Sequence, residues 1–205
     1  MATIGTLTRV EIKPGNEAII EHALQEAFSI VQQELATTAW VAFRQGSSTF
    51  SVFDAFPDET GRRAHLSDER HRARLERVNS LLAQPRTTEM LHVLAAKLPA
   101  QGATRTVTVG FLSRFEAKPG KEAEIEQALN GTLLAVQQLP TTTAWFGLRL
   151  GPSTFGTVDL FPDEAGRQTH YHARWPQLQA SASQMFVEGS LVIEKVDVLL
   201  AKLPG

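Results

Sequence analysis

The chain has 205 residues, and its 42% hydrophobic content is enough to build an ordinary globular core in one or two domains. Its 20 basic and 22 acidic residues give a net charge of −2 and form no block of like charge, so we expect no nucleic-acid partner. Cysteine is absent, which excludes disulfides, thiolate metal sites, iron–sulfur clusters and cysteine nucleophiles.

The first residues lack the basic and apolar regions of a secretory signal. No apolar run approaches the roughly 18 residues that are needed to cross a bilayer. We therefore expect a cytoplasmic protein that makes no membrane contact.

The two halves of the chain repeat each other at a constant offset of 105 residues. Four motifs show the repeat, namely Lys-Pro-Gly, Thr-Thr-Ala-Trp, Phe-Pro-Asp-Glu and Ala-Lys-Leu-Pro, which begin at Lys13, Thr37, Phe56 and Ala96 and again at Lys118, Thr142, Phe161 and Ala201. The matches run from end to end. We therefore predict two copies of one module, residues 1–100 and 106–205, with a small and polar linker at 101–105.

Each module begins with a strand and a helix. Alternating apolar residues over 4–12 and 107–117 predict a strand that ends at the Lys-Pro-Gly turn. Apolar residues at helical spacing then predict a helix of about five turns. They are Ile20, Leu24, Phe28, Val31 and Leu35 in the first module and Ile125, Leu129, Leu133 and Val136 in the second.

A β-hairpin, a second helix and a last strand complete each module. The hairpin strands are expected at 40–44 and 50–56, and at 145–150 and 155–161. Pro57 and Asp58 offer a strand stop and a helix N-cap, and Pro176 is expected to bend or interrupt the second helix of the second module. The last strands are expected at 87–94 and 191–200, which gives the ferredoxin-like order β-α-β-β-α-β.

The expected fold class is α+β. Both faces of each hairpin are apolar, so the sheet face without helices also needs a cover. We predict two tandem ferredoxin-like modules packed sheet to sheet as an intrachain dimeric α+β barrel, a pseudo-dimer that either stays alone or pairs again as a homodimer. The residues on the second face are Val41, Phe43, Phe53 and Ala55 in the first module and Phe146, Leu148, Val158 and Leu160 in the second.

Four hairpin residues are identical in both modules: Trp40, Arg44, Phe50 and Asp54 recur as Trp145, Arg149, Phe155 and Asp159. If Arg44 pairs with Phe50, Trp40 lies opposite Asp54. Its indole N–H could then bond to the carboxylate and leave the guanidinium of Arg44 to face a ligand. The alternative is a packed tryptophan with satisfied polar neighbours and an arginine that reaches solvent.

A glycine and a histidine near the start of the second helix also recur, Gly61 and His65 as Gly166 and His170. Glycine inside a first helical turn costs about 1 kcal/mol relative to alanine, which indicates close approach of another element or a ligand. The histidine could serve as a general base or donate to a phenolic oxygen, or it could simply fix the helix or lie exposed. No metal is expected, because no carboxylate is clearly placed to complete the pair of His170 and His172.

Together these motifs resemble the antibiotic biosynthesis monooxygenase family over nearly the whole chain. The resemblance implies a dimeric α+β barrel with one cavity per module, between the sheet and the helices. It also implies oxidation of polycyclic phenols or small quinols by molecular oxygen without metal, flavin or heme, so no cofactor is expected. The residues expected to carry this chemistry are His65, His170, Arg44 and Arg149, with Trp40, Trp145, Phe50, Phe155, Asp54, Asp159, Phe56 and Phe161 around the substrate.

The chain departs from that family at two places. Phe56 and Phe161 stand where many active relatives carry a tryptophan. Leu75 and Leu178 occupy the neighbourhood of the iron-ligating histidine of the heme-degrading branch, which disfavours heme.

Three functions follow from these observations. The leading hypothesis is a cofactor-independent monooxygenase that acts on an aromatic quinol or polycyclic phenol. The alternatives are a non-catalytic module that binds a small hydrophobic metabolite, and a structural or regulatory barrel that binds a protein partner.

Overall fold

A computed structural model describes residues 2–99 and 106–204, so the predicted linker at 101–105 lies outside the described residues. Contacts divide the described chain into two units. Unit 1 comprises the residues up to Met90 together with Asp197–Pro204, and unit 2 comprises Leu91–Val196. The boundaries fall inside two strands, so each unit receives the end of a strand that begins in the other.

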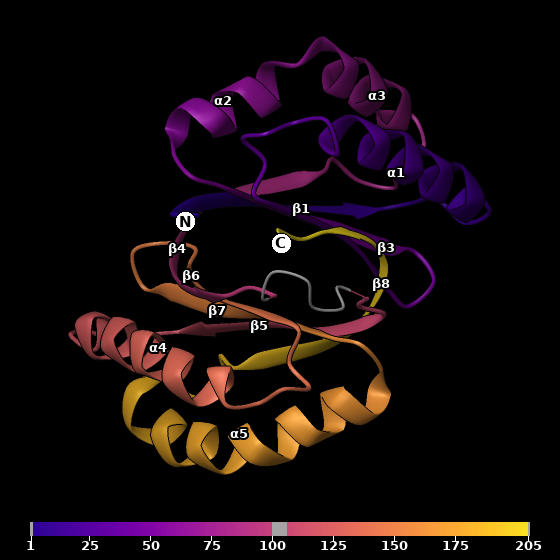
Figure 1. The fold of residues 1–205 in the computed structure, drawn as a ribbon. Coiled ribbons are helices and arrows are strands. Elements are labelled where there is room, and N and C mark those ends of the chain that lie inside the picture. Colours follow the sequence, from indigo (N-terminus) through magenta and orange to yellow (C-terminus); the bar gives the residue numbers. More distant parts are fainter. Residues whose placement is uncertain (1, 100–105, 205) are drawn as a thin grey trace. The chain divides into compact units, whose positions relative to one another are not determined.

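In unit 1, three helices lie on one face of the sheet (Figure 1). Its elements are β1 (Ile4–Glu11), α1 (Glu17–Val31), β2 (Ala39–Gln45), β3 (Thr49–Phe56), α2 (Glu59–Ser67), α3 (Glu69–Asn79) and the beginning of β4 (Thr87–Lys97). The side chain of Asp58 accepts a hydrogen bond from the backbone N–H of Gly61, which confirms the predicted N-cap of the second helix.

Unit 2 repeats this arrangement with two helices on one face of its sheet (Figure 1). Its elements are β5 (Val109–Glu116), α4 (Glu122–Gln137), β6 (Ala144–Arg149), β7 (Thr154–Phe161), α5 (Glu164–Met185) and the beginning of β8 (Val192–Lys202). Asp163 caps α5 through a bond from the N–H of Gly166, as Asp58 caps α2.

Hydrogen bonds order the strands β1-β3-β2-β8 in unit 1 and β5-β7-β6-β4 in unit 2. The end of β8 pairs with β2 inside unit 1, and the end of β4 pairs with β6 inside unit 2. The predicted fold class is thereby confirmed: the chain is an α+β protein of two ferredoxin-like modules in tandem. The Ala-Lys-Leu-Pro motif belongs to these exchanged strand ends.

The hairpin register agrees with the prediction. Arg44 pairs with Phe50 and Trp40 with Asp54, and unit 2 has the same pairs. The face turned away from the helices is buried in both units, which is why its alternate residues are as apolar as those under the helices. Its residues are Val41, Phe43, Phe53 and Ala55, and Phe146, Leu148, Val158 and Leu160.

The structure differs from the helix predictions at two places. The first helix ends at Val31, and Leu35 lies fully exposed beyond it. The second helix is interrupted in unit 1, where Asp68 has an extended backbone and caps α3, whereas α5 runs through Pro176 without a break. An aspartate competes for backbone N–H groups and so favours a helix start, while the equivalent Ala173 in unit 2 favours continuation.

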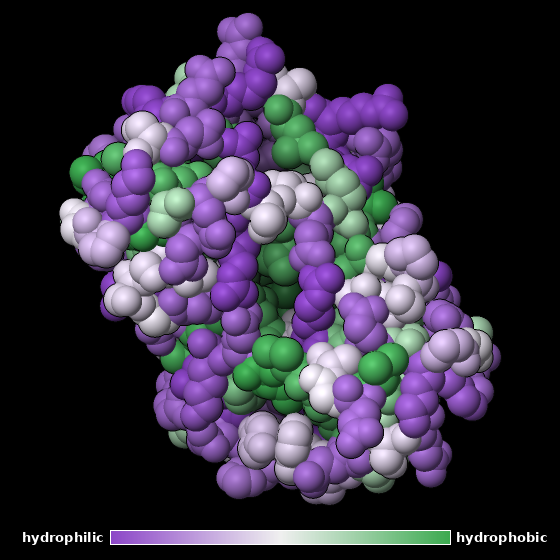
Figure 2. Space-filling model, turned by 180° about the vertical axis from the view of Figure 1, so that it is seen from behind, coloured by the Kyte–Doolittle hydropathy of each residue, from purple (hydrophilic) through white to green (hydrophobic). Residues whose placement is uncertain are grey.

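Hydrophilic side chains dominate the face shown in Figure 2, and the hydrophobic ones gather in small patches among them. Among the described residues, no helix combines the length and apolarity that a membrane span requires.

Candidate active site

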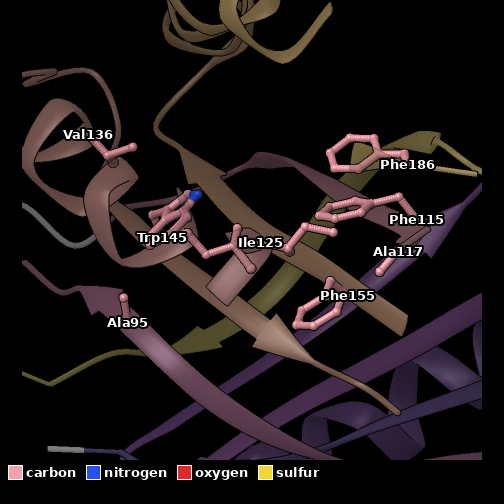
Figure 3. Close-up of a cluster of buried hydrophobic side chains, with 9 residues drawn as sticks. Ala95, Phe115, Ala117, Ile125, Val136, Trp145, Phe155 and Phe186 are labelled. Carbon is pink, nitrogen blue, oxygen red and sulfur yellow. The ribbon is translucent and has the colours of Figure 1, made fainter. Parts of the chain in front are cut away.

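Unit 2 contains a cavity of about 410 Å³ between its sheet and the helices α4 and α5. Trp145 and Ile125 belong to both the cavity wall and the buried cluster shown in Figure 3. Phe115 and Phe186 stack with 4.1 Å between their ring centroids and line the same space. The volume lies in the range of small-molecule sites, and aromatic walls favour a flat hydrophobic ligand.

His170 and Asp159 supply the titratable pair on the wall of this cavity. His170 Nε2 lies 3.1 Å from Asp159 Oδ1, and both side chains are almost fully buried. The Thr142 hydroxyl lies 2.9 Å from His170 Nδ1, so a ring that donates from Nε2 accepts from Thr142 at Nδ1. Thr157 donates to Asp159 Oδ2 at 2.5 Å. These contacts hold a carboxylate at the edge of an apolar space.

Arg174 on α5 also lines the cavity. Burial lowers the pKa of its guanidinium from the ordinary value, and the charge of Asp159 opposes that shift. Arg174 donates to Thr132 Oγ1 at 3.0 Å and to Gln177 Oε1 at 2.7 Å. A half-buried guanidinium in this position can stabilise negative charge on a bound molecule.

Two aromatic residues of α5 line both this cavity and a second one of about 440 Å³. Tyr171 and Trp175 line both spaces, and their rings stack at 5.2 Å with 19° between the planes. The second space reaches Lys195 on β8. A ligand in the main cavity would therefore lie against a stacked aromatic pair.

Unit 1 carries the same histidine–aspartate pair in different surroundings. His65 Nε2 lies 3.5 Å from Asp54 Oδ1. Its other nitrogen, Nδ1, lies 2.7 Å from Glu34 Oε2, while Glu34 Oε1 lies 2.7 Å from His71 Nε2. Thr37 donates to Glu34 Oε2 at 2.5 Å. Unit 1 thus holds a buried polar network around its histidine.

This network changes the proton affinities of its members. Burial raises the pKa of Asp54. Burial would also raise the pKa of Glu34, but hydrogen bonds from His65, His71 and Thr37 hold it well below its ordinary value. For His65, burial favours the neutral ring, yet the Glu34 hydrogen bond and the charge of Asp54 raise its pKa. Arg74, also largely buried, has its pKa lowered by that burial.

The two units differ because the residues that build the network do not recur. Leu139 stands at the position equivalent to Glu34, and Pro176 at the position equivalent to His71. His71 also lies in the first turn of the separate helix α3, whose start depends on Asp68. These two positions are therefore apolar in unit 2 and ionisable in unit 1.

The structure does not bring the shared arginines to the histidines. Arg44 Nη1 lies 3.1 Å from Glu21 on α1, and Arg149 Nη1 lies 2.5 Å from Glu126 on α4. Arg149 also donates to the backbone oxygens of Gly151 and Pro152. Both guanidiniums are part-exposed and hold the hairpin against the first helix of their unit.

The shared aromatic residues have three different positions. Trp40 packs under α1 with Phe28, at 5.9 Å between ring centroids, whereas Trp145 lines the cavity of unit 2. No hydrogen bond joins either indole to its paired aspartate among the described contacts: Asp54 accepts from Thr6 at 2.9 Å, and Asp159 from Thr157. The remaining four residues are buried. Phe50 and Phe155 belong to the hydrophobic clusters under α1 and α4. The ring centroids of Phe56 and Phe161 lie 5.3 Å from that of His65 and 5.1 Å from that of His170, respectively.

Sequence reasoning missed Glu34, His71, Thr142 and Arg174. Of these, Thr142 lies in a motif common to both halves, so the repeat itself could have indicated it. The other three residues differ between the halves, so a search restricted to shared residues could not find them.

Comparisons with known proteins place the fold. No family model matches the chain, and no curated protein matches it. A "putative monooxygenase" from Fusobacterium nucleatum subsp. nucleatum superposes over 100% of this chain and 95% of its own, with a TM-score of 0.87 and 11% identity. The fold implied by the resemblance is confirmed. An anthrone oxidase-like protein matches over 100% of this chain and 94% of its own, with a TM-score of 0.63 and 12% identity.

A protein of unknown function from Nitrosomonas europaea is similar to half of the chain. It is 44% identical over 49% of this chain and 97% of its own, with a TM-score of 0.46.

Proposed function

We propose that the chain is a cofactor-independent monooxygenase and that the cavity of unit 2 binds its substrate, an aromatic quinol or polycyclic phenol. The observation that carries this proposal is the buried His170–Asp159 pair at the wall of an aromatic cavity of about 410 Å³. The full-length neighbours described as a monooxygenase and as anthrone oxidase-like support the reaction class.

In this proposal, Asp159 accepts the proton of the phenolic hydroxyl, and His170 holds that carboxylate in place by donating to it from Nε2. Arg174 stabilises the anion that forms in the cavity. The electron-rich anion reduces molecular oxygen directly. One oxygen atom enters the product and the other leaves as water, with both hydrogens and the electrons supplied by the substrate. Apolar walls keep bulk water away from the anion.

Oxygen uptake tests this function. The full chain is incubated with anthrone and with hydroquinones in an oxygen-electrode cell, and kcat/KM is measured for the natural chain and for Asp159→Asn. Because the carboxylate is the proposed proton acceptor, we expect kcat/KM to fall by about 10²- to 10⁴-fold. The matched control is Asp54→Asn in unit 1, which we expect to leave most of the activity.

Three outcomes contradict this proposal. One is an Asp159→Asn variant that is as active as the natural chain, and another is an Asp54→Asn variant that loses the larger share of activity. The third is ligand-dependent thermal stabilisation by these phenols without oxygen uptake, which would favour a non-catalytic binding module.

A further inference from the structure

Three potential metal ligands converge in unit 1 from three separate segments. Glu34 follows α1, His65 belongs to α2, and His71 belongs to α3. Each offers one ligand atom, and the three atoms lie within 4.8 Å of one another. All three side chains are at least mostly buried, with 15%, 9% and 3% of their surface exposed. We propose that Glu34, His65 and His71 bind a divalent transition-metal ion, with Zn²⁺ as the preferred ion.

The chemistry of the three ligands suits zinc. Two imidazole nitrogens and one carboxylate oxygen form a known ligand set for zinc sites that keep a fourth position open. Ligand bonds of about 2.0–2.2 Å in a tetrahedron place the ligand atoms roughly 3.3 Å apart. The carboxylate oxygens of Glu34 now lie 2.7 Å from His65 Nδ1 and from His71 Nε2, so small side-chain rotations would admit the ion.

The surrounding residues already orient two of the ligands. If His65 binds the ion through Nδ1, its Nε2–H faces Asp54 Oδ1 at 3.5 Å, and that buried oxygen has no hydrogen-bond partner among the described contacts. A carboxylate behind a ligating histidine fixes the ring and strengthens the ligand. Thr37 fixes the orientation of the Glu34 carboxylate by donating a hydrogen bond to Oε2 at 2.5 Å.

The charges near the site are mixed. Glu34 and Asp54 bring negative charge close to the proposed ion, and Arg74 and Lys202 bring positive charge. Lys202 donates to the backbone oxygen of Glu34 at 2.6 Å, so its ammonium points at the main chain and not at the carboxylate. A dication therefore enters a site with two carboxylates and two cations, and we expect it to bind at micromolar metal concentrations.

Unit 2 shows that the fold does not require these ligands. Leu139 and Pro176 replace Glu34 and His71 there, and the same strands and first helix still form. Burying three ionisable side chains together costs desolvation free energy, which only good pairing among them offsets. Keeping them in unit 1 alone is consistent with a functional role there. The duplication thus supplies an internal control, because one histidine, His170, lies at the equivalent place without the other two ligands.

Titration with Co²⁺ and Zn²⁺ tests the site. The full chain, with any affinity tag removed, is treated with a chelator and titrated with Co²⁺ while visible absorption is recorded. Tetrahedral coordination by nitrogen and oxygen would give d–d bands in the visible range that saturate at one ion per chain and disappear when Zn²⁺ is added. Calorimetry with Zn²⁺ gives the stoichiometry independently.

Two variants and one control decide the assignment. We expect His71→Gln and Glu34→Gln each to weaken Zn²⁺ binding at least tenfold, and His22→Gln, which removes an exposed histidine of unit 1, to leave it unchanged. Circular dichroism checks that each variant is folded, and the near-isosteric Glu34→Gln serves if His71→Gln does not fold. The proposal is overturned if the natural chain binds no ion, or if both ligand variants keep one ion with the original affinity.

Discussion

The lysine of the repeated Ala-Lys-Leu-Pro motif is expected to stabilise each unit by capping its first helix. Lys97 Nζ donates to the backbone oxygens of Val136 and Leu139 at 3.0 and 2.7 Å, inside unit 2. Lys202 Nζ donates in the same way to Val31 and Glu34 at 2.7 and 2.6 Å, inside unit 1. Carbonyl groups at a helix end have no partner within the helix and carry partial negative charge.

Replacing Lys97 by methionine keeps the apolar stem and removes the ammonium. A hydrogen bond to a charged group contributes about 1.5–3 kcal/mol, and the interaction with the helix end about 0.3–1 kcal/mol. Burial of the ammonium lowers the pKa of Lys97. Because the side chain is also partly exposed, solvent screens part of this stabilisation. We therefore expect Lys97→Met, and likewise Lys202→Met, to lower the free energy of unfolding by about 2 kcal/mol.

Urea unfolding followed by fluorescence and circular dichroism measures this loss as a lower midpoint at an unchanged m-value. For a chain of this size, it corresponds to a melting temperature lower by about 4–8 °C. Lys121→Met is the matched control, because that lysine makes only an exposed pair with Glu124 at 2.6 Å and should cost less than about 0.5 kcal/mol. If both cap variants lose no more than this control, the capping explanation of the repeated motif is refuted.

Three further substitutions test other parts of the structure. A Cβ added at Gly131 in α4 would meet no atom within 4 Å. Gly131→Ala should therefore raise the free energy of unfolding by about 0.5–1 kcal/mol, measured by a thermal melt. A lower stability would contradict the open surroundings. Gly147→Ala would place a Cβ 2.7 Å from Trp145 Cη2, so the indole at the cavity wall must shift. We expect the fold to be retained, because unit 1 has Ala42 at the equivalent position beside Trp40, and we expect calorimetry to show weaker binding of phenolic ligands. Unchanged affinity would exclude Trp145 from the ligand site. Asp68→Ala removes the cap of α3 and should cost about 1 kcal/mol at neutral pH. Because hydrogen bonding to Arg70 lowers the pKa of Asp68 from 3.8 to about 2, its contribution is present above pH 4 and is lost as the pH falls through 2, so the difference from the natural chain should shrink in acid; a constant difference would refute the electrostatic part of the cap.

The repeat carried most of the fold prediction. Period-two and helical patterns located the strands and first helices, and the double apolar hairpin, with Val41 and Phe43 alternating with Trp40, indicated a sheet buried on both faces. The exchange of strand ends between units was not predictable, because β4 reads the same whichever neighbour it pairs with. The helix break was missed since a proline is a stronger sequence signal than the capping aspartate Asp68.

The site residues were selected by a single criterion, identity in both modules. Residues identical in both modules are those that both folds need, so they include the histidine–aspartate pair but also Arg44 and Arg149, whose partners Glu21 and Glu126 recur with them. These arginines hold the hairpin to a helix, and a shared structural role preserves identity as effectively as a shared chemical one.

What distinguishes the two modules lies in the residues around the common pair. With Leu139 and Pro176, unit 2 leaves the aspartate–histidine pair at the edge of an apolar cavity, where a carboxylate can accept a proton from a bound phenol. With Glu34 and His71, unit 1 surrounds the same pair with side chains that can coordinate a cation or form hydrogen bonds with one another. A duplicated fold keeps both sites in one chain, so one copy can change its chemistry while the other retains an apolar pocket. The oxygen-uptake and metal-binding experiments examine the two copies separately, because Asp159 and His71 belong to different units.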